Sequence, residues 1–205
     1  LCVTLGPGIL RNIYDGIQRP LPALEKASRP FIARGSNIPS LDPDAKWDVT
    51  VTVKVGEKLT PGQIYATCPE TPVILHKCMA APGVEGTVTW VAENGSYTVN
   101  DTVVRITDKS GKERELTLCQ KWPIRRPRPV QARMPAQRPL ITGMRVVDTM
   151  FPIAKGGAAA IPGGFGTGKT MTQHQLAKWC DADIIIYVGC GERGNEMTQV
   201  LQEFS

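Results

Sequence analysis

The segment from Gly163 to Thr170 carries the clearest chemical signal in this sequence. It reads Gly-Gly-Phe-Gly-Thr-Gly-Lys-Thr and satisfies G-x-x-x-x-G-K-[ST], the phosphate-binding P-loop. In such loops, backbone N–H groups converge on phosphates at a helix N-terminus, Lys169 reaches the β- and γ-phosphates, and Thr170 ligates Mg²⁺. The predicted ligand-binding residues are Gly163, Gly164, Phe165, Gly166, Thr167, Gly168, Lys169 and Thr170.

A second candidate segment, Gly189 to Glu196, reads Gly-Cys-Gly-Glu-Arg-Gly-Asn-Glu. A helix of about 13 residues extends about 20 Å, and a return strand of about six residues covers the same distance. Glu192 is therefore expected at the edge of the sheet that holds the P-loop, where it could accept a hydrogen bond from an attacking water. A structural role, in which Glu192 caps the following helix, is equally compatible with this geometry.

A strand, a helix and a second strand must position these two segments. We expect a short buried strand at Ala158–Ile161, a helix at Lys169–Asp181, a second buried strand at Ile184–Val188 and another helix from Asn195 to Phe204. One face of the first helix is expected to gather Thr172, Leu176, Trp179 and Cys180. This order predicts the opening of a doubly wound parallel sheet, a partial RecA-like P-loop α/β domain at 141–205.

The residues before this region have a different pattern. Val49, Val51, Val53 and Val55 alternate with polar residues, as in a half-buried strand. Further strand-like runs are at Gln63–Thr67, Val73–Met79, Gly86–Val91, Thr102–Thr107 and Glu115–Leu118. Turns are expected at Gly56-Glu57, Pro82-Gly83, Asn94-Gly95 and Ser110-Gly111. The sequence thus predicts a small all-β domain at 30–122, with residues 1–29 ending a preceding domain.

The formal net charge of +5 has a local origin. Every charged residue from Lys121 to Val147 is basic, and the same stretch is rich in proline. We expect a solvated, extended connector at 123–140 whose arginines meet acidic neighbours. The alternative is an anion-binding patch.

The remaining composition indicates a reducing compartment, which we take to be the cytoplasm. No two of the six cysteines have C-x-x-C spacing, so we expect free thiols and no zinc site. Ile184–Val188 is the longest apolar run, far shorter than the roughly 20 residues of a membrane-spanning helix. Because the first residue is not methionine, we expect an internal piece of a longer protein.

Several motifs together are similar to the catalytic A subunit (alpha chain) of V-type and A-type rotary ATPases. They are the segments 151–157 (Phe-Pro-Ile-Ala-Lys-Gly-Gly), the P-loop, 173–179 (Gln-His-Gln-Leu-Ala-Lys-Trp) and 186–197 (Ile-Tyr-Val-Gly-Cys-Gly-Glu-Arg-Gly-Asn-Glu-Met). Residues 14–21 resemble that family's boundary after its N-terminal barrel. The β-rich region resembles the insertion that distinguishes A subunits from F-type β subunits.

The resemblance implies an ATPase or ATP synthase coupled to proton or sodium transport. It implies that Lys169 and Thr170 bind the phosphates of ATP or ADP and Mg²⁺, that Glu192 positions the hydrolytic water, and that Arg193 supports the γ-phosphate region. The implied partners are the B subunit, which alternates with A in a ring and supplies an arginine finger, and the central and peripheral stalks. Membrane contact would run only through the ion-translocating sector, and the 205 residues alone would hydrolyse ATP negligibly.

Two other functions compete with this interpretation. Residues 55–63 and 81–88 are similar to the two halves of a lipoyl or biotinyl carrier, but Lys77 lies in a strand-like run and not at a hairpin tip. A Rho-like RNA-dependent translocase shares the P-loop scaffold and would use the arginine-rich connector. Single-strand binders also need aromatic stacking surfaces, and Trp122 is the only aromatic residue between Lys121 and Met150. We therefore expect no nucleic acid partner.

Overall fold

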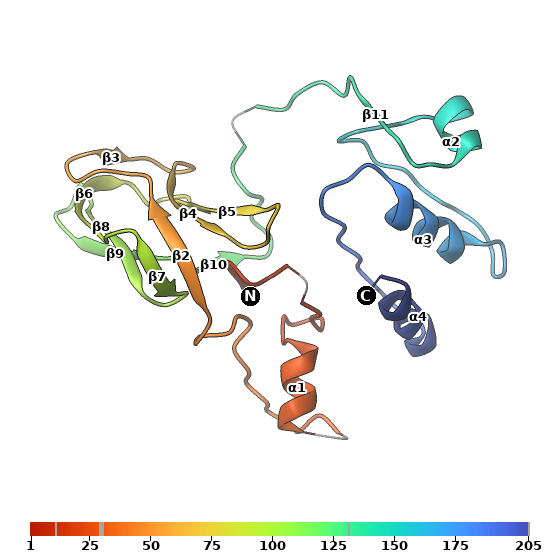
Figure 1. Ribbon diagram of the computed structural model, residues 1–205, viewed down its shortest axis with the longest axis horizontal. Coiled ribbons are helices and arrows are strands. Elements are labelled where there is room, and N and C mark those ends of the chain that lie inside the picture. Colours follow the sequence, from red (N-terminus) through yellow and green to blue (C-terminus); the bar gives the residue numbers. More distant parts are fainter. Residues whose placement is uncertain (11, 29–30, 131, 205) are drawn as a thin grey trace. The chain divides into compact units, whose positions relative to one another are not determined.

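The computed structural model describes residues 1–10, 12–28, 31–130 and 132–204 (Figure 1). The chain divides into two compact units, Leu1–Gln131 and Ala132–Ser205, which we call the N-terminal unit and the C-terminal unit. Within the described residues, no helix is both long and apolar enough to span a membrane.

Antiparallel strands build the N-terminal unit. The strands are β1 (Cys2–Leu5), β2 (Lys46–Val51), β3 (Lys58–Leu59), β4 (Ile64–Pro69), β5 (Leu75–Met79), β6 (Gly86–Val91), β7 (Gly95–Thr98), β8 (Thr102–Thr107), β9 (Glu113–Thr117) and β10 (Gln120–Pro123). They form a sheet of order β5-β4-β2-β7, a sheet of order β3-β6-β8-β9 and the separate pair β1-β10. Figure 1 shows the two larger sheets at the red-to-green end of the chain.

Both four-stranded sheets contribute to one hydrophobic core. Val49 and Cys68 enter it from the first sheet, and Leu59, Val104 and Ile106 enter it from the second. Each of these side chains is at most 2% exposed. Because alternate strand residues point to opposite faces, the period-2 pattern in the sequence becomes a buried face and a solvated face.

The structure confirms most of the strand pattern expected in this region. Residues 46–51, 64–69, 75–79, 86–91, 102–107 and 113–117 are strands, each within a few residues of the expected bounds. The first strand is shorter than the valine alternation indicated: β2 ends at Val51, and Val55 is 61% exposed at a turn. The expectation missed β1, β3, β7 and β10. Strand β1 is four residues long and pairs with β10, far away in sequence, so no local pattern marks it.

A short helix and one buried carboxylate complete the N-terminal unit. Helix α1 (Leu21–Ala27) has proline in its first turn, where the missing N–H is not needed, and buries Leu24. Glu70 accepts hydrogen bonds from the backbone N–H groups of Gly8 and Leu10, at 2.7 and 3.1 Å. It thereby ties the N-terminal segment to the β4–β5 hairpin.

The C-terminal unit contains three helices and one small ribbon in its described residues. Strand β11 (Pro139–Leu140) pairs with β12 (Ile153–Ala154), and helix α2 (Arg145–Met150) lies between them in sequence. Helix α3 (Lys169–Trp179) follows the P-loop, and helix α4 (Gly194–Phe204) follows the second candidate segment. The two predicted helices are therefore confirmed, with α3 two residues shorter than expected.

The two strands predicted for this unit do not form. Residues 158–161 and 184–188 lack strand structure, and Ile186 and Val188 are 82% and 72% exposed. A parallel strand becomes buried only when neighbouring strands pair with it and helices cover both faces. Within the described residues, β11 and β12 are the only paired strands of this unit, and neither expected strand has a partner.

The buried side of α3 also differs from the expected one. Trp179 is 61% exposed and donates its indole N–H to Gln175 Oε1 on the same helix. Thr172, Leu176 and Cys180 are half-buried, and the fully buried side chain is His174. His174 is buried because it faces Tyr187 and α4, and this contact cannot be read from the helix sequence alone.

The connector is extended, as predicted, but its arginines do not pair with acidic residues. All described residues from 124 to 138 are exposed and outside helices and strands. In that described stretch, no arginine forms an ion pair, because the exposed segment does not bring these side chains next to a carboxylate. Arg128 instead stacks over the Trp122 ring, 4.3 Å from its centroid.

Candidate functional site

The glycine loop from Gly163 to Gly168 leads directly into helix α3. Gly166 and Gly168 adopt φ angles of +76° and +83°, which glycine reaches without strain. Gly168 is the N-cap of α3, no side chain caps this end, and the first turn contains no acidic residue. The first N–H groups of a helix have no partners within it, and its dipole is positive there. This end of α3 therefore favours a negatively charged ligand.

Lys169 curls back over the loop. Its Nζ donates hydrogen bonds to the carbonyl oxygens of Gly163 and Gly164, both at 2.5 Å, and Thr167 Oγ1 donates to the Gly164 carbonyl at 2.8 Å. A Cβ atom at Gly163 would collide with Thr167 Oγ1, so a side chain at 163 would displace the Thr167 hydroxyl from this closed loop. The ammonium group is thus held above the loop by weak neutral acceptors that an anion can replace.

A ring contact connects the loop to the second candidate segment. Phe165 is 88% exposed, and the Arg193 guanidinium carbon lies 5.2 Å from the centroid of its ring. Such cation–π contacts form within about 6 Å. The structure therefore places Arg193 beside Phe165 of the P-loop, although 158–161 and 184–188 are not strands.

Glu192 lies two residues before helix α4 and is half-buried. Its Oε2 accepts a hydrogen bond from the Tyr187 hydroxyl at 3.3 Å. Among the described residues, no backbone N–H of α4 donates to Glu192, and Glu196 supplies the acidic residue of the first turn. The carboxylate therefore faces back toward Tyr187.

Helices α3 and α4 meet around His174, which sequence reasoning did not select. This ring is 2% exposed, packs edge-on against Tyr187 at a centroid distance of 5.8 Å, and has Nδ1 3.3 Å from Glu203 Oε2. Partial burial, followed by the charge of Glu192, raises the pKa of Tyr187. The only sequence signal for this contact is that His174 and Tyr187 belong to segments 173–179 and 186–197, which are expected to lie close together.

Two aspartates fix the backbone before and after this region. Asp148 accepts hydrogen bonds from the Thr142 hydroxyl and from the N–H groups of Thr142 and Gly143, and the Thr142 hydroxyl is the main cause of its lowered pKa. Asp181 pairs with Lys155 at 2.6 Å and accepts from the Ile141 N–H. The hydrogen bond from Lys155 is the main cause of the lowered pKa of Asp181. These contacts hold the end of α3 against the chain near Ile141.

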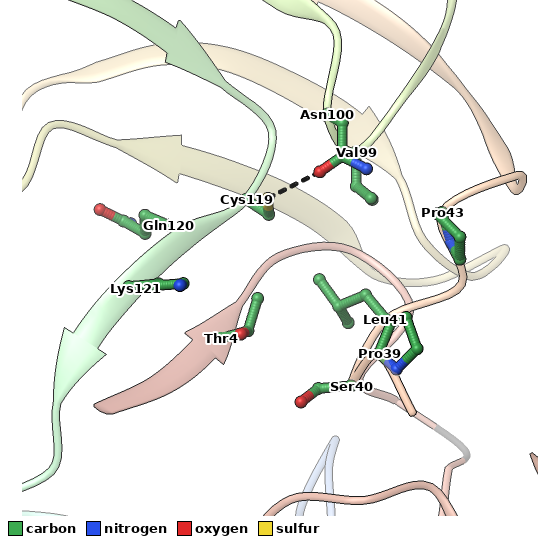
Figure 2. Close-up of a pocket in the computed structure, with 10 residues that line it drawn as sticks. All are labelled: Thr4, Pro39, Ser40, Leu41, Pro43, Val99, Asn100, Cys119, Gln120 and Lys121. Carbon is green, nitrogen blue, oxygen red and sulfur yellow. Dashed lines mark hydrogen bonds between the residues drawn. The ribbon is translucent and has the colours of Figure 1, made fainter. Parts of the chain in front are cut away.

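A cavity of about 320 Å³ lies in the N-terminal unit, away from these residues in sequence (Figure 2). It is lined by Thr4, Pro39, Ser40, Leu41, Pro43, Val99, Asn100, Cys119, Gln120 and Lys121. Lys121 is the only charged residue in this lining, and none of the predicted site residues belongs to it. The cavity therefore gives no support to an alternative reaction centre.

Two family models match the chain. The barrel-sandwich domain of the ATP synthase alpha/beta subunit matches residues 38–125, and the nucleotide-binding domain of the ATP synthase alpha/beta family matches residues 143–205. The chain belongs to the ATP synthase alpha/beta family. The fold class predicted from the sequence, a small all-β domain followed by a P-loop α/β domain, is therefore confirmed. The second match contains the P-loop, Glu192 and Arg193.

Within the ATP synthase alpha/beta family, this chain is similar to proteins named as A subunits and alpha chains. It is 56% identical over 204 residues to the V-type ATP synthase alpha chain of Halothermothrix orenii, covering 100% of this chain and 35% of that protein. It is 55% identical over 204 residues to the A subunit of the A-type ATP synthase of Methanopyrus kandleri and to the V-type ATP synthase alpha chain 2 of Clostridium tetani. It covers 34% of each of those two proteins and 100% of itself. The chain thus spans about a third of the length of these relatives.

Proposed function

We propose that this chain is the part of a catalytic A subunit that binds ATP or ADP in a V-type or A-type rotary ATPase. The whole enzyme would couple ATP hydrolysis or synthesis to proton or sodium transport. The observation that carries this proposal is the uncapped, acid-free N-terminus of α3 behind a glycine loop that holds Lys169. Relatives named as ATP synthase chains support the same function.

In this proposal, the loop residues 163–170 hold the phosphates. Lys169 would exchange its two carbonyl acceptors for phosphate oxygens, because a hydrogen bond between charged groups is stronger than one to a neutral carbonyl. Glu192 would orient the attacking water, and Arg193, held beside Phe165, would stabilise the γ-phosphate region.

The residues present also fit Mg²⁺. Magnesium prefers oxygen ligands, takes few of them from protein, and completes its shell with water and phosphate. Thr170 offers a hydroxyl in the first turn of α3, next to the loop. When bound, the ion would neutralise charge that develops on the phosphates.

The partners follow from the same proposal. A neighbouring B subunit would alternate with this subunit in a ring and contribute an arginine finger. Central and peripheral stalk subunits would connect the ring to a membrane sector that translocates ions. The subunit would then work in the cytoplasm as part of the soluble head, peripheral to the membrane.

The two competing functions find little support in the structure. Trp122 is 4% exposed and donates its indole N–H to the Arg126 carbonyl at 2.6 Å, so it offers no free face on which RNA bases could stack. Lys77 lies within strand β5 and pairs in register with Thr67, whereas a carrier domain presents its lysine at a hairpin tip. The relatives with high identity carry neither function in their names.

The test is a Lys169→Ala substitution in the full-length subunit, measured in complex with its partner subunits. Loss of a charge-assisted contact worth about 1.5 to 3 kcal/mol should weaken ATP binding by roughly 10- to 150-fold. Hydrolysis should fall further, because transition-state charge also loses its partner. Lys178→Ala is the matched control: this exposed lysine lies at the far end of α3, where its Nζ is 5.6 Å from the centroid of the Trp179 ring. Unchanged ATPase activity in Lys169→Ala would refute the proposal.

A further inference from the structure

Tyr187 is turned inward in a run of outward-facing residues. Its neighbours Ile186 and Val188 are 82% and 72% exposed, whereas Tyr187 is half-buried. The ring packs edge-on against the buried His174 ring of α3, at 5.8 Å and an interplanar angle of 67°. Since α3 also begins with Lys169, the Tyr187 ring is anchored on the helix whose first turn forms the end of the phosphate loop.

The hydroxyl at the far end of this ring reaches Glu192. It donates to Oε2 at 3.3 Å, and a carboxylate can accept several more hydrogen bonds while one oxygen is occupied. Burial and the charge of Glu192 raise the pKa of Tyr187, so this hydroxyl keeps its proton and remains a donor at neutral pH. One polar contact thus restricts the rotation of a side chain that lies on a segment without regular structure.

We propose that Tyr187 is a positioning residue that holds the Glu192 carboxylate in place for its work on the attacking water, through the Tyr187–Glu192 hydrogen bond and the packing of its ring on His174. This inference rests on the proposed function, because it requires that Glu192 acts in turnover. Tyr187 itself touches no reacting atom in this scheme. Its effect should therefore appear in turnover and not in nucleotide affinity.

Other charged groups lie close to the Tyr187–Glu192 pair. Glu196 in the first turn of α4 also acts on Tyr187, and the His174 ring on its other side faces Glu203. A hydrogen bond donated to a carboxylate favours the charged form. Removing the Tyr187 hydroxyl should therefore leave the Glu192 carboxylate with one donor fewer and freer to rotate, which lowers turnover.

The decisive variant is Tyr187→Phe in the full-length subunit in complex with its partners, since it keeps the ring against His174 and removes only the hydroxyl. We expect ATP affinity within about twofold of the parent and kcat lower by about tenfold. Tyr97→Phe serves as the control, because it removes a hydroxyl that donates to the Glu93 carbonyl in the N-terminal unit. That control should match the parent in kcat and in ATP affinity.

The Glu192→Gln variant, measured in parallel, distinguishes the positioning role of Tyr187 from the catalytic role of Glu192. The proposed function predicts a fall in kcat of about 10²- to 10⁴-fold for this variant. The combination of Tyr187→Phe with Glu192→Gln should then be no slower than Glu192→Gln alone, because both changes act through one carboxylate. A parental kcat in Tyr187→Phe, with Glu192→Gln inactive, would overturn the positioning role only. Near-parental turnover in Glu192→Gln would overturn the catalytic role of Glu192 itself.

Discussion

At the scale of single residues, the Glu70 carboxylate links segments of the N-terminal unit that are far apart in sequence. Its side chain is 5% exposed and lies 3.1 Å from His76 Nδ1 in addition to its two backbone donors. A buried N–H group that loses its acceptor destabilises the folded state, because it has neither a protein partner nor the water that solvates it in the unfolded chain. A single side chain therefore provides the acceptor for the backbone N–H groups of both Gly8 and Leu10.

We predict that Glu70→Ala lowers the free energy of unfolding by about 2 to 4 kcal/mol, because two backbone donors and His76 lose a shared, charged acceptor. Urea unfolding of the chain, followed by circular dichroism, measures this loss. The control is Glu113→Ala, which removes an exposed carboxylate at the start of β9 and should cost less than about 0.5 kcal/mol. Equal effects of the two substitutions would contradict the role of Glu70.

The buried thiols make stability depend on pH. Burial raises the pKa of Cys68 to about 11 and that of Cys78 to about 12, from an ordinary 9.0. Above about pH 9, the unfolded chain loses these protons before the folded one does, so stability must fall as pH rises toward the folded values. The stabilising contribution is complete below pH 9 and disappears through pH 11 to 12.

We predict that the stability advantage of the parent over a Cys68→Ala, Cys78→Ala double variant shrinks above pH 9, by up to about 1.4 kcal/mol per pH unit for each thiol. Urea unfolding at pH 8, 9 and 10 gives this difference, and titrations common to both proteins cancel in it. A difference that stays constant over this range would show that the thiols ionise alike in both states.

At the scale of elements, the sequence predicts those helices and strands that form from a local residue pattern. Valines that alternate with polar residues mark a strand with one buried face, and Val49 and Val53 are indeed buried. The predicted helices after the P-loop and around 195–204 also form. In contrast, 158–161 and 184–188 do not form strands, because an apolar run becomes a strand only when a neighbour pairs with it.

In the candidate site too, some residues can be predicted from a local motif and others depend on tertiary contacts. The P-loop residues could be selected from a motif, because the chemistry fixes their types and spacing. Tyr187 and His174 could not, because their contact depends on how α3 meets a segment eight or more residues beyond its end. Side chains that act through a neighbour become visible only when tertiary contacts are known.

Strand β6 begins at a glycine that the packing requires. A Cβ atom at Gly86 would lie 2.8 Å from the Thr107 carbonyl carbon, and backbone cannot swing away as a flexible side chain can. At Gly95, the start of β7, the nearest atom to such a Cβ would be Tyr97 Cε2 at 3.6 Å, an ordinary contact. Neither glycine has a positive φ, so sterics alone separate the two positions.

We therefore predict that Gly86→Ala destabilises the chain by about 1 to 3 kcal/mol through overpacking, while Gly95→Ala is neutral or slightly stabilising. Thermal unfolding of both variants beside the parent tests the difference in midpoint. Similar midpoints for the two variants would mean that β6 can shift away from Thr107 at little cost.

At the scale of the whole molecule, two compact units are joined by a basic segment. Strand β10 ends at Pro123 and β11 begins at Pro139, and all described residues from 124 to 138 are exposed. Prolines keep such a segment extended, and like charges resist its collapse. Exposed chain outside helices and strands is also where proteases act first.

Limited trypsin digestion of the chain tests this organisation, and the sequence restricts where cuts can occur. Proline follows Arg126, Arg128 and Arg138, and trypsin does not cleave before proline. We predict early cuts after Arg125 and Arg133, while the strands from 46 to 123 survive as one fragment, because cleavage there requires unfolding of the core.

Two matched variants each replace arginines of the connector, but only one of them should slow the digestion. Replacing Arg125 and Arg133 by Gln removes both cleavable bonds of the connector and should slow the separation of the units at least about tenfold, since the remaining sites open only by local unfolding. Arg138→Gln removes one positive charge but no cleavable bond, because Pro139 follows it, so the rate should stay at the parental value. Mass spectrometry of the early fragments assigns the cuts. First cuts inside residues 46–123 would show that trypsin reaches the β strands before it reaches the connector. That result would refute the division into a stable N-terminal unit and an accessible linker.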